Sequence, residues 1–205
     1  MDFDRMRRQL FVPGAVALIF MSWGCGQMMG ARALPSLPRG VTAEASELPY
    51  NVTGTTVPEI RLSLRTAATA ALGSGRVGLH RSRLRYRYRY RHQGTYCMMT
   101  SVTIELESAI QVPRWTDREA ADSTLVAMWD TYITALRGHE YTHRQYLYRR
   151  ARDISRELYR IQSPACNSMQ SRVNSTVQLI DDRYRELNEQ FDEESRGTLT
   201  WPPRR

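Results

Sequence analysis

The hydrophobic periodicity changes near Pro113, and this change constrains the fold more than any other feature of the sequence. After Pro113, apolar residues recur every three or four positions in two long segments, a spacing typical of helices that bury one face. The first segment follows Thr116 and Glu119, whose spacing is that of a capping box, and it stops at Pro164. The second spans about residues 165–194. The sequence therefore predicts two long helices in its second half.

Residues 49–112 have the character of strands instead. Residues 59–65 and 83–92 alternate between apolar and polar side chains, and residues 98–106 are rich in β-branched residues. A further short strand is expected at residues 50–53. Strands that come first and helices that follow are typical of an α+β fold. We expect a small antiparallel sheet from the N-terminal half, packed on the two long C-terminal helices.

The first 33 residues have the pattern of a secretory signal peptide. Basic residues are followed by a short apolar run, and residues 31–33 have the Ala-x-Ala form of a cleavage site. Export is therefore expected, to the periplasm or out of the cell. Cys25 leaves a second interpretation open, in which this cysteine carries a lipid that anchors the protein to the membrane. After residue 25, no run is apolar for long enough to be a membrane span.

The rest of the chain has room for one domain, because the whole sequence has only 205 residues. Residues 34–48 contain prolines and a glycine without any periodicity, so we expect a linker there. Residues 49–200 are expected to form a single domain, and residues 201–205 a short tail.

Two cysteines remain after the signal peptide, Cys97 and Cys166. In the oxidising compartment that export implies, an isolated pair of cysteines is most simply a disulfide. A metal-binding pair is the weaker alternative, because no other cysteine or histidine lies within a few residues of Cys166. A disulfide that closes a loop of about 70 residues would stabilise the fold by roughly 3–4 kcal/mol.

Residues 139–143 have the H-E-x-x-H pattern, with His139, Glu140 and His143 at its fixed positions. On a helix, residues four apart lie one turn apart on the same face, so both imidazoles can bind one Zn²⁺. Glu140 can then take a proton from the water molecule that the metal activates for attack on a carbonyl. The alternative is a pair of core histidines, since both continue the apolar face of the first helix. Two of the chain's four histidines fall in this pattern, with a glutamate in its proper place, which favours the metal site.

Other short segments of the chain stand in the order seen in a known family. They are residues 50–54, 59–61 and 112–115, Cys97, Trp129, residues 138–143, Cys166 and residues 191–192. By these segments, residues 49–200 resemble a bacterial domain family of uncharacterised function described as predicted secreted zinc-dependent proteases. The resemblance implies a metallopeptidase-like, zincin-like domain that binds Zn²⁺ and acts on a polypeptide substrate.

The chain departs from the family pattern near its C-terminus. The family ends in Tyr-Asp-x-x-Thr-x-His-Gly, whereas residues 191–197 here are one residue shorter and lack the histidine. Because a carboxylate can complete a catalytic zinc site with two histidines, an acidic residue is the best substitute. Asp192 matches a position of the family pattern and is the expected third ligand, with Glu193 and Glu194 as alternatives.

Three other residues have side chains that could act at such a site. His80 and His92 match no position of the family, and both are expected to be ordinary loop or strand-end residues. Tyr146 is a candidate donor to an oxyanion, but a core tyrosine is the simpler interpretation.

Arginine and tyrosine alternate in residues 85–91. Arginines beside aromatic residues are also found where proteins bind single-stranded nucleic acids. Strict alternation, however, places the tyrosines on the core face of a strand and the arginines on the opposite face. We expect a solvated arginine face and no nucleic-acid partner, while contact with an anionic envelope surface or an acidic substrate stays open.

The sequence thus predicts an exported zinc-dependent metallopeptidase, in which His139, His143 and Asp192 hold the metal and Glu140 is the general base. Two alternatives remain. In the first, the protein binds zinc in the envelope but lost its catalysis with the family's final histidine. In the second, it is a non-enzymatic envelope module that interacts through the arginine-rich strand.

Overall fold

The computed structural model describes residues 36–203. The expected signal peptide and the candidate lipid acceptor Cys25 lie outside the described residues. Within the described part of the chain, no helix is both long enough and apolar enough to cross a membrane. The main elements, in chain order, are β1 (Val41–Val52), α1 (Val57–Leu72), β2 (Leu79–Gln93), β3 (Tyr96–Trp115), α2 (Ser123–Arg160), β4 (Gln162–Ser163) and α3 (Met169–Glu194).

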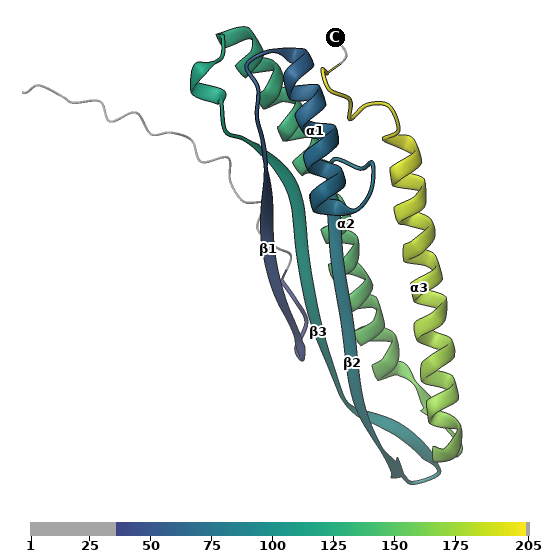
Figure 1. The fold of residues 1–205 in the computed structure, drawn as a ribbon. Helices are drawn as coiled ribbons and strands as arrows, with labels where there is room; N and C mark the ends of the chain where they lie inside the picture. Colours follow the sequence, from purple (N-terminus) through teal and green to yellow (C-terminus); the bar gives the residue numbers. More distant parts are fainter. Residues whose placement is uncertain (1–35, 204–205) are drawn as a thin grey trace, which may run out of the picture. The chain divides into compact units, whose positions relative to one another are not determined.

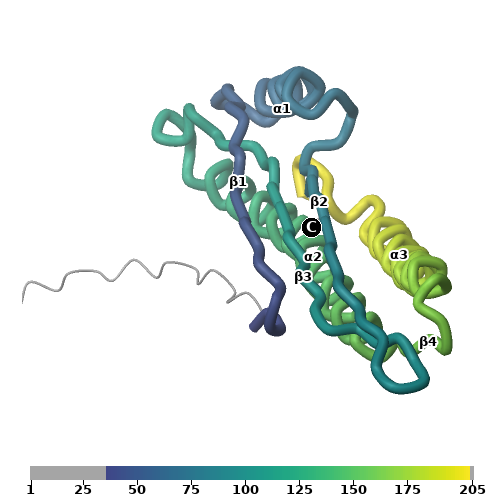
Figure 2. Tube along the Cα trace, turned by 90° about the horizontal axis from the view of Figure 1, so that it is seen from below, coloured from purple at the N-terminus to yellow at the C-terminus, as the bar shows by residue number. Residues whose placement is uncertain are grey.

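The fold is α+β, as expected, but the sheet is mixed rather than antiparallel. Its strand order is β1-β3-β2, and the short β4 pairs with the beginning of β3. β2 and β3 form an antiparallel hairpin, whereas β1 runs parallel to β3. The parallel pair is possible because α1 and β2 lie between β1 and β3 in the sequence, which gives the chain room to return in the same direction. The three strands lie side by side, with α2 running along the sheet and α3 next to β2 (Figures 1 and 2).

The prediction of a linker at residues 34–48 is wrong for its second half, because β1 begins at Val41. Most side chains of β1 are exposed, and only Val41, Tyr50 and Val52 are buried. A strand of this kind is held by main-chain pairing with its neighbour, here with residues 104–115 of β3. Its side chains therefore carry no alternating apolar pattern that the sequence could reveal.

The strand expected at residues 59–65 is also wrong, because these residues belong to α1. The buried side chains are Ile60, Leu64, Ala68 and Leu72, which are spaced by one helical turn, whereas Leu62 is 65% exposed. The helix begins with a capping box. The Thr56 side chain accepts a hydrogen bond from the main-chain N–H of Glu59, and the Glu59 carboxylate accepts one from the main-chain N–H of Thr56. This start signal outweighs the short run of alternating residues.

The two long helices are present, with a small shift at the start of the first. α2 is capped by Asp122, whose side chain accepts from the main-chain N–H of Leu125 at 2.9 Å. The expected capping residue Thr116 instead donates its hydroxyl to the Val52 carbonyl at the end of the sheet. α3 covers most of the segment expected at residues 165–194.

Two apolar clusters lie at opposite ends of α2. The α1 cluster joins α1, the ends of β1 and β3, and the apolar segment of α2, whose buried residues are Leu125, Trp129, Tyr132, Ile133 and Leu136. The α3 cluster joins the middle of the sheet to α3 and to the last turns of α2. Trp201, expected in a tail, packs with its ring centroid 5.5 Å from those of Trp129 and Tyr132. Residues 139–144 of α2 lie between the two clusters.

Cys97 and Cys166 lie at disulfide-bonding distance, with their Cα atoms 5.1 Å apart. Cys97 is buried at the beginning of β3, and Cys166 lies in the short turn that precedes α3. The bond joins residues 69 positions apart and ties the hairpin to the connection between the two long helices. The expected pairing is therefore compatible with the fold.

The arginine–tyrosine segment lies in β2 and has the two faces that alternation predicts. Tyr86 and Tyr88 pack against the α3 cluster. The arginines lie on the opposite face of the sheet, where some pair with glutamates of β3, as Arg85–Glu107 at 3.1 Å and Arg87–Glu105 at 3.4 Å. Because these pairs are exposed, each contributes little to stability.

Candidate metal centre

The helical H-E-x-x-H segment and one residue of α3 bring three potential metal ligands together. His139 Nε2 and His143 Nε2 are 3.0 Å apart. Asp192 Oδ1 lies 3.2 Å from His139 Nε2 and 2.9 Å from His143 Nε2. The three atoms therefore form a compact triangle at the contact between α2 and α3.

This triangle has nearly the size that a tetrahedral zinc site requires. With ligand bonds of about 2.0–2.1 Å, neighbouring ligand atoms of a tetrahedron lie about 3.3 Å apart. The chemistry also fits, because two imidazole nitrogens and one carboxylate oxygen are an accepted catalytic zinc set. His139, His143 and Asp192 form a group that could hold a metal ion. In the same group, the Asp192 side chain is 41% exposed, so the site is open to solvent at Asp192.

Of the three carboxylates considered as third ligand, the structure brings only Asp192 to the histidines. Glu193 forms an ion pair with Arg196 on the surface. The Glu194 carboxylate accepts from Gln190 one turn earlier on α3, at 2.7 Å. Both glutamates thus point away from the centre, like side chains of a solvated helix end.

Asn188 orients His143 and was not foreseen from the sequence. Its Oδ1 lies 2.6 Å from His143 Nδ1, and its amide nitrogen donates to the Tyr184 carbonyl, which fixes the orientation of the amide. Since an amide oxygen only accepts, Nδ1 of His143 must carry the proton. The lone pair of the neutral ring is then on Nε2, which faces His139 and Asp192, as a metal ligand requires. The sequence did contain one indication of this role: Asn188 and Asp192 are four residues apart, and therefore lie on the same face of one helix.

Phe191 encloses the histidines on the α3 side. Its ring stacks on His139 with centroids 4.7 Å apart and meets His143 and Tyr146 edge to face. Burial lowers the pKa of His139, the neighbouring His143 lowers it further, and Asp192 opposes the shift. Nδ1 of His139 is buried with no hydrogen-bond partner within the described residues. On the Nδ1 side the ring is therefore held by packing alone, whereas Nε2 faces Asp192.

Glu140 is next to the centre without belonging to the ligand group. The side chain is buried, with 5% exposure. Burial raises its pKa to about 7, the Asp192 carboxylate adds to this, and Arg76 and the main-chain N–H of His80 oppose it. Gly78, just before β2, passes so close that any side chain there would clash with the Glu140 carboxylate. A side chain at this position would therefore displace the Glu140 carboxylate, so the glycine allows Glu140 to lie against the start of β2.

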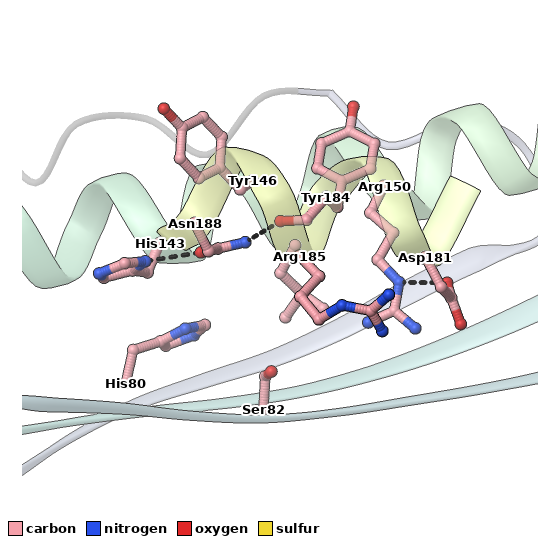
Figure 3. A pocket seen from close by; sticks show the side chains of 10 residues that line it. His80, Ser82, His143, Tyr146, Arg150, Asp181, Tyr184, Arg185 and Asn188 are labelled. Atoms are coloured by element: carbon pink, nitrogen blue, oxygen red, sulfur yellow. Dashed lines mark hydrogen bonds and ion pairs between the residues drawn. The ribbon is translucent and has the colours of Figure 1, made fainter. Parts of the chain in front are cut away.

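The centre opens into two adjoining cavities. The larger has a volume of about 690 Å³ and is lined by the loop before β2, by α2 around Glu140, and by the end of α3. The smaller, of about 300 Å³, lies on the other side of His143 between β2 and the two helices (Figure 3). At its far end, Arg150 of α2 pairs with Asp181 of α3 at 2.7 Å. Both cavities are bordered by His80, Ser82, His143 and Asn188.

His80 corrects an expectation, because it lies at the centre rather than being an ordinary strand residue. Its ring is parallel to that of His143, with centroids 6.5 Å apart, and its Nε2 is 2.9 Å from Ser108 Oγ. Burial, with smaller effects from His143 and Arg144, lowers the pKa of His80 to about 4. His92, in contrast, is exposed at the end of β2, as expected. Nothing local in the sequence separates the two, because the place of His80 depends on the pairing of β2 with β3.

Comparisons with known proteins support the family resemblance. Neither the curated proteins nor the solved structures include a match to this chain. A family model does match, over residues 48–198, which is nearly the whole described domain and includes every residue of the centre. The chain therefore belongs to the family described as "Bacterial protein of unknown function (DUF922)".

Proposed function

We propose that this protein is an exported zinc-dependent metallopeptidase. The observation that supports the proposal most is the triangle of His139 Nε2, His143 Nε2 and Asp192 Oδ1, with sides of 2.9–3.2 Å. It lies beside a buried glutamate at a cavity of about 690 Å³. A ligand set of this kind, with a carboxylate next to it, is the arrangement that hydrolytic zinc sites use.

Each residue has a separate task in this proposal. His139, His143 and Asp192 would hold the metal, and Asn188 keeps Nε2 of His143 free to bind it. A bound Zn²⁺ would polarise the substrate carbonyl and make a water molecule more acidic. Glu140 would take the proton from that water and pass it to the leaving nitrogen. Without metal, burial is the main cause that raises the pKa of Glu140 to about 7; a bound Zn²⁺ would lower this pKa, so that the ionised carboxylate could accept the proton.

The cavities support an extended polypeptide as substrate. They lie on both sides of His143, so a chain that crosses the centre would have room on each side of the scissile bond. The signal pattern of residues 1–33 supports export, which would place the substrate in the bacterial envelope or outside the cell.

The deciding experiment measures zinc and turnover in the same preparations. We expect one Zn²⁺ per chain in the wild type, and none after His139→Ala or His143→Ala, because two remaining ligands do not hold a tetrahedral site. Asp192→Ala should weaken binding steeply. Turnover of an unstructured protein should be lost in Glu140→Gln while its zinc content stays the same, because this change removes only the proton acceptor.

Glu193→Ala is the matched control, because it removes the neighbouring carboxylate, which pairs with Arg196 instead. It should keep both zinc and turnover. Full zinc binding without turnover in the wild type would show a metal-binding protein that has lost catalysis. A wild type that binds no added zinc would end the metallopeptidase proposal.

A further inference from the structure

A buried serine links β3 to His80 and to a buried arginine. Ser108 is only 4% exposed and lies on the helix-facing side of β3. Its Oγ accepts from Nε of Arg144 at 2.8 Å and lies 2.9 Å from Nε2 of His80. Arg144 also donates through Nη2 to the Ser46 carbonyl, at 2.6 Å. These contacts hold the serine hydroxyl between one donor and one imidazole.

This arrangement determines which nitrogen of His80 carries the proton. An arginine can only donate, so the hydroxyl must direct its own proton elsewhere. Among the described residues, Nε2 of His80 is the one acceptor within hydrogen-bond distance of Ser108 Oγ. Nε2 therefore accepts, and the proton of the neutral ring is on Nδ1. A doubly protonated ring would also carry a proton on Nδ1, so the assignment of a donor there does not depend on titration.

The donor lies where a substrate would bind. His80 borders both cavities, and in Figure 3 its side chain extends from β2 toward His143. Within the described residues, Nδ1 has no hydrogen-bond partner, so its N–H is available to a ligand. The main chain of the same residue lies close enough to Glu140 to lower the pKa of its carboxyl group. One residue thus approaches the candidate base with its main chain and presents a donor with its side chain.

We propose that His80 is a catalytic residue whose Nδ1–H donates a hydrogen bond to the carbonyl oxygen of the scissile peptide bond. This inference rests on the proposed metallopeptidase function. The hydrogen bond strengthens as the carbonyl oxygen gains negative charge during attack, so it stabilises the transition state more than the bound substrate. No proton is transferred, and Arg144 and Ser108 act as positioning residues that hold the tautomer.

The first test reads the tautomer directly and requires no activity. A long-range ¹H–¹⁵N correlation spectrum of the metal-free, full-length mature protein distinguishes the two neutral forms of each histidine. We expect the His80 signals to be those of the Nδ1–H form, and His80→Asn identifies which signals belong to this residue. The Nε2–H form would overturn the proposal, because Nδ1 would then have no proton to donate.

The second test compares three substitutions of His80 in the zinc-loaded protein. In His80→Asn, the amide nitrogen can take the place of Nδ1, so most of kcat should be kept. In His80→Ala and His80→Gln, kcat should fall by about 10²- to 10³-fold, the usual effect of losing one such donor. KM and zinc affinity should change little, because the three substitutions remove no metal ligand and the lost hydrogen bond acts mainly in the transition state.

His92→Ala is the control, because His92 lies exposed at the other end of the same strand. It should leave kcat unchanged. If the wild type hydrolyses peptides and His80→Ala does so at the same rate, the role of His80 is refuted while the proposed function stands. A wild type that binds zinc without turnover would refute the proposed function, and the catalytic role of His80 with it, whatever the tautomer.

Discussion

Two neighbouring segments of α2 are buried to a similar degree but differ in chemistry. In the apolar segment, residues 125–136, the buried side chains are Leu125, Trp129, Tyr132, Ile133 and Leu136. In the polar segment, residues 139–144, the buried side chains are Glu140 and Arg144, and both histidines are nearly buried. The helix is continuous through both, so the difference lies only in which side chains the buried face carries.

The two segments contribute differently to the molecule. The apolar segment removes large side chains from water, which stabilises the fold in proportion to the buried area. In the polar segment most buried groups need a hydrogen-bond partner, because an unpaired charge or hydrogen-bonding group is costly inside a protein, and Nδ1 of His139 is an exception within the described residues. Arg144 donates to the Ser108 hydroxyl and the Ser46 carbonyl, and Nδ1 of His143 donates to Asn188. We infer that the apolar segment provides the stability that allows the polar segment to keep these groups buried.

The largest effect is expected in the apolar segment. Trp129 contacts the rings of Trp115, Tyr132 and Trp201, so Trp129→Ala leaves a cavity that the neighbours cannot fill. Urea denaturation should show a loss of about 3–5 kcal/mol in the free energy of unfolding. The exposed Leu62 of α1 is the control, since Leu62→Ala should change stability by less than about 0.5 kcal/mol. The zinc affinity of the folded Trp129→Ala protein should be unchanged. A large loss of affinity would show that the two segments are not independent.

A smaller effect is expected from the pH dependence of the polar segment. The pKa of Glu140 is about 7 in the folded protein and 4.5 ordinarily, so the folded state binds its proton more tightly. Between pH 4.5 and 7 the folded state keeps this proton while the unfolded chain has lost it. Glu140 therefore makes the metal-free protein less stable as the pH rises through this window, by up to about 3 kcal/mol.

His80 acts in the opposite sense, because its pKa is about 4 in the folded protein and 6.5 ordinarily. Between these values the unfolded chain binds the proton, so stability rises with pH. The lowered pKa of His139 adds to this rise. In the wild type, the effects of Glu140 and of the histidines on the free energy of unfolding should largely cancel between pH 4.5 and 6.5. Urea denaturation of metal-free Glu140→Gln should show the free energy of unfolding rising with pH. If it does not change with pH in this variant, the pKa values of the two histidines are not lowered in the folded protein.

Much of this organisation could be predicted from local sequence patterns. The long helices, the β2–β3 hairpin and the H-E-x-x-H segment depend on periodicity and spacing within a short stretch. The pairing of Cys97 with Cys166 was predicted because these two cysteines remain after the expected signal peptide of an exported chain. In α1, the residues Ile60, Leu62 and Leu64 fit a strand as well as a helix, and the capping box at Thr56 was the signal that would have decided between them.

The missed features depend on contacts between distant parts of the chain. β1 has few buried side chains, and its parallel pairing with β3 is made through the main chain. His80 reaches the centre because β2 pairs with β3 and Gly78 lets it approach Glu140. Asn188 meets His143 only when α3 packs on α2. None of these contacts has a local pattern of its own.

The smallest effect is expected at Asn188, where the change should alter metal affinity and hardly alter the fold. Asn188 accepts from Nδ1 of His143 and thereby keeps the lone pair of the ring on Nε2. In Asn188→Ala both tautomers of His143 become available, and the ring is less well oriented. Competition with a chromophoric chelator should show zinc affinity lowered by about 10- to 100-fold. In Asn188→Asp, a carboxylate oxygen can accept the same proton, so affinity should stay near that of the wild type. Equal affinity in the wild type and Asn188→Ala would show that packing against Phe191 alone orients His143, and the polar segment would then depend on apolar contacts as the apolar segment does.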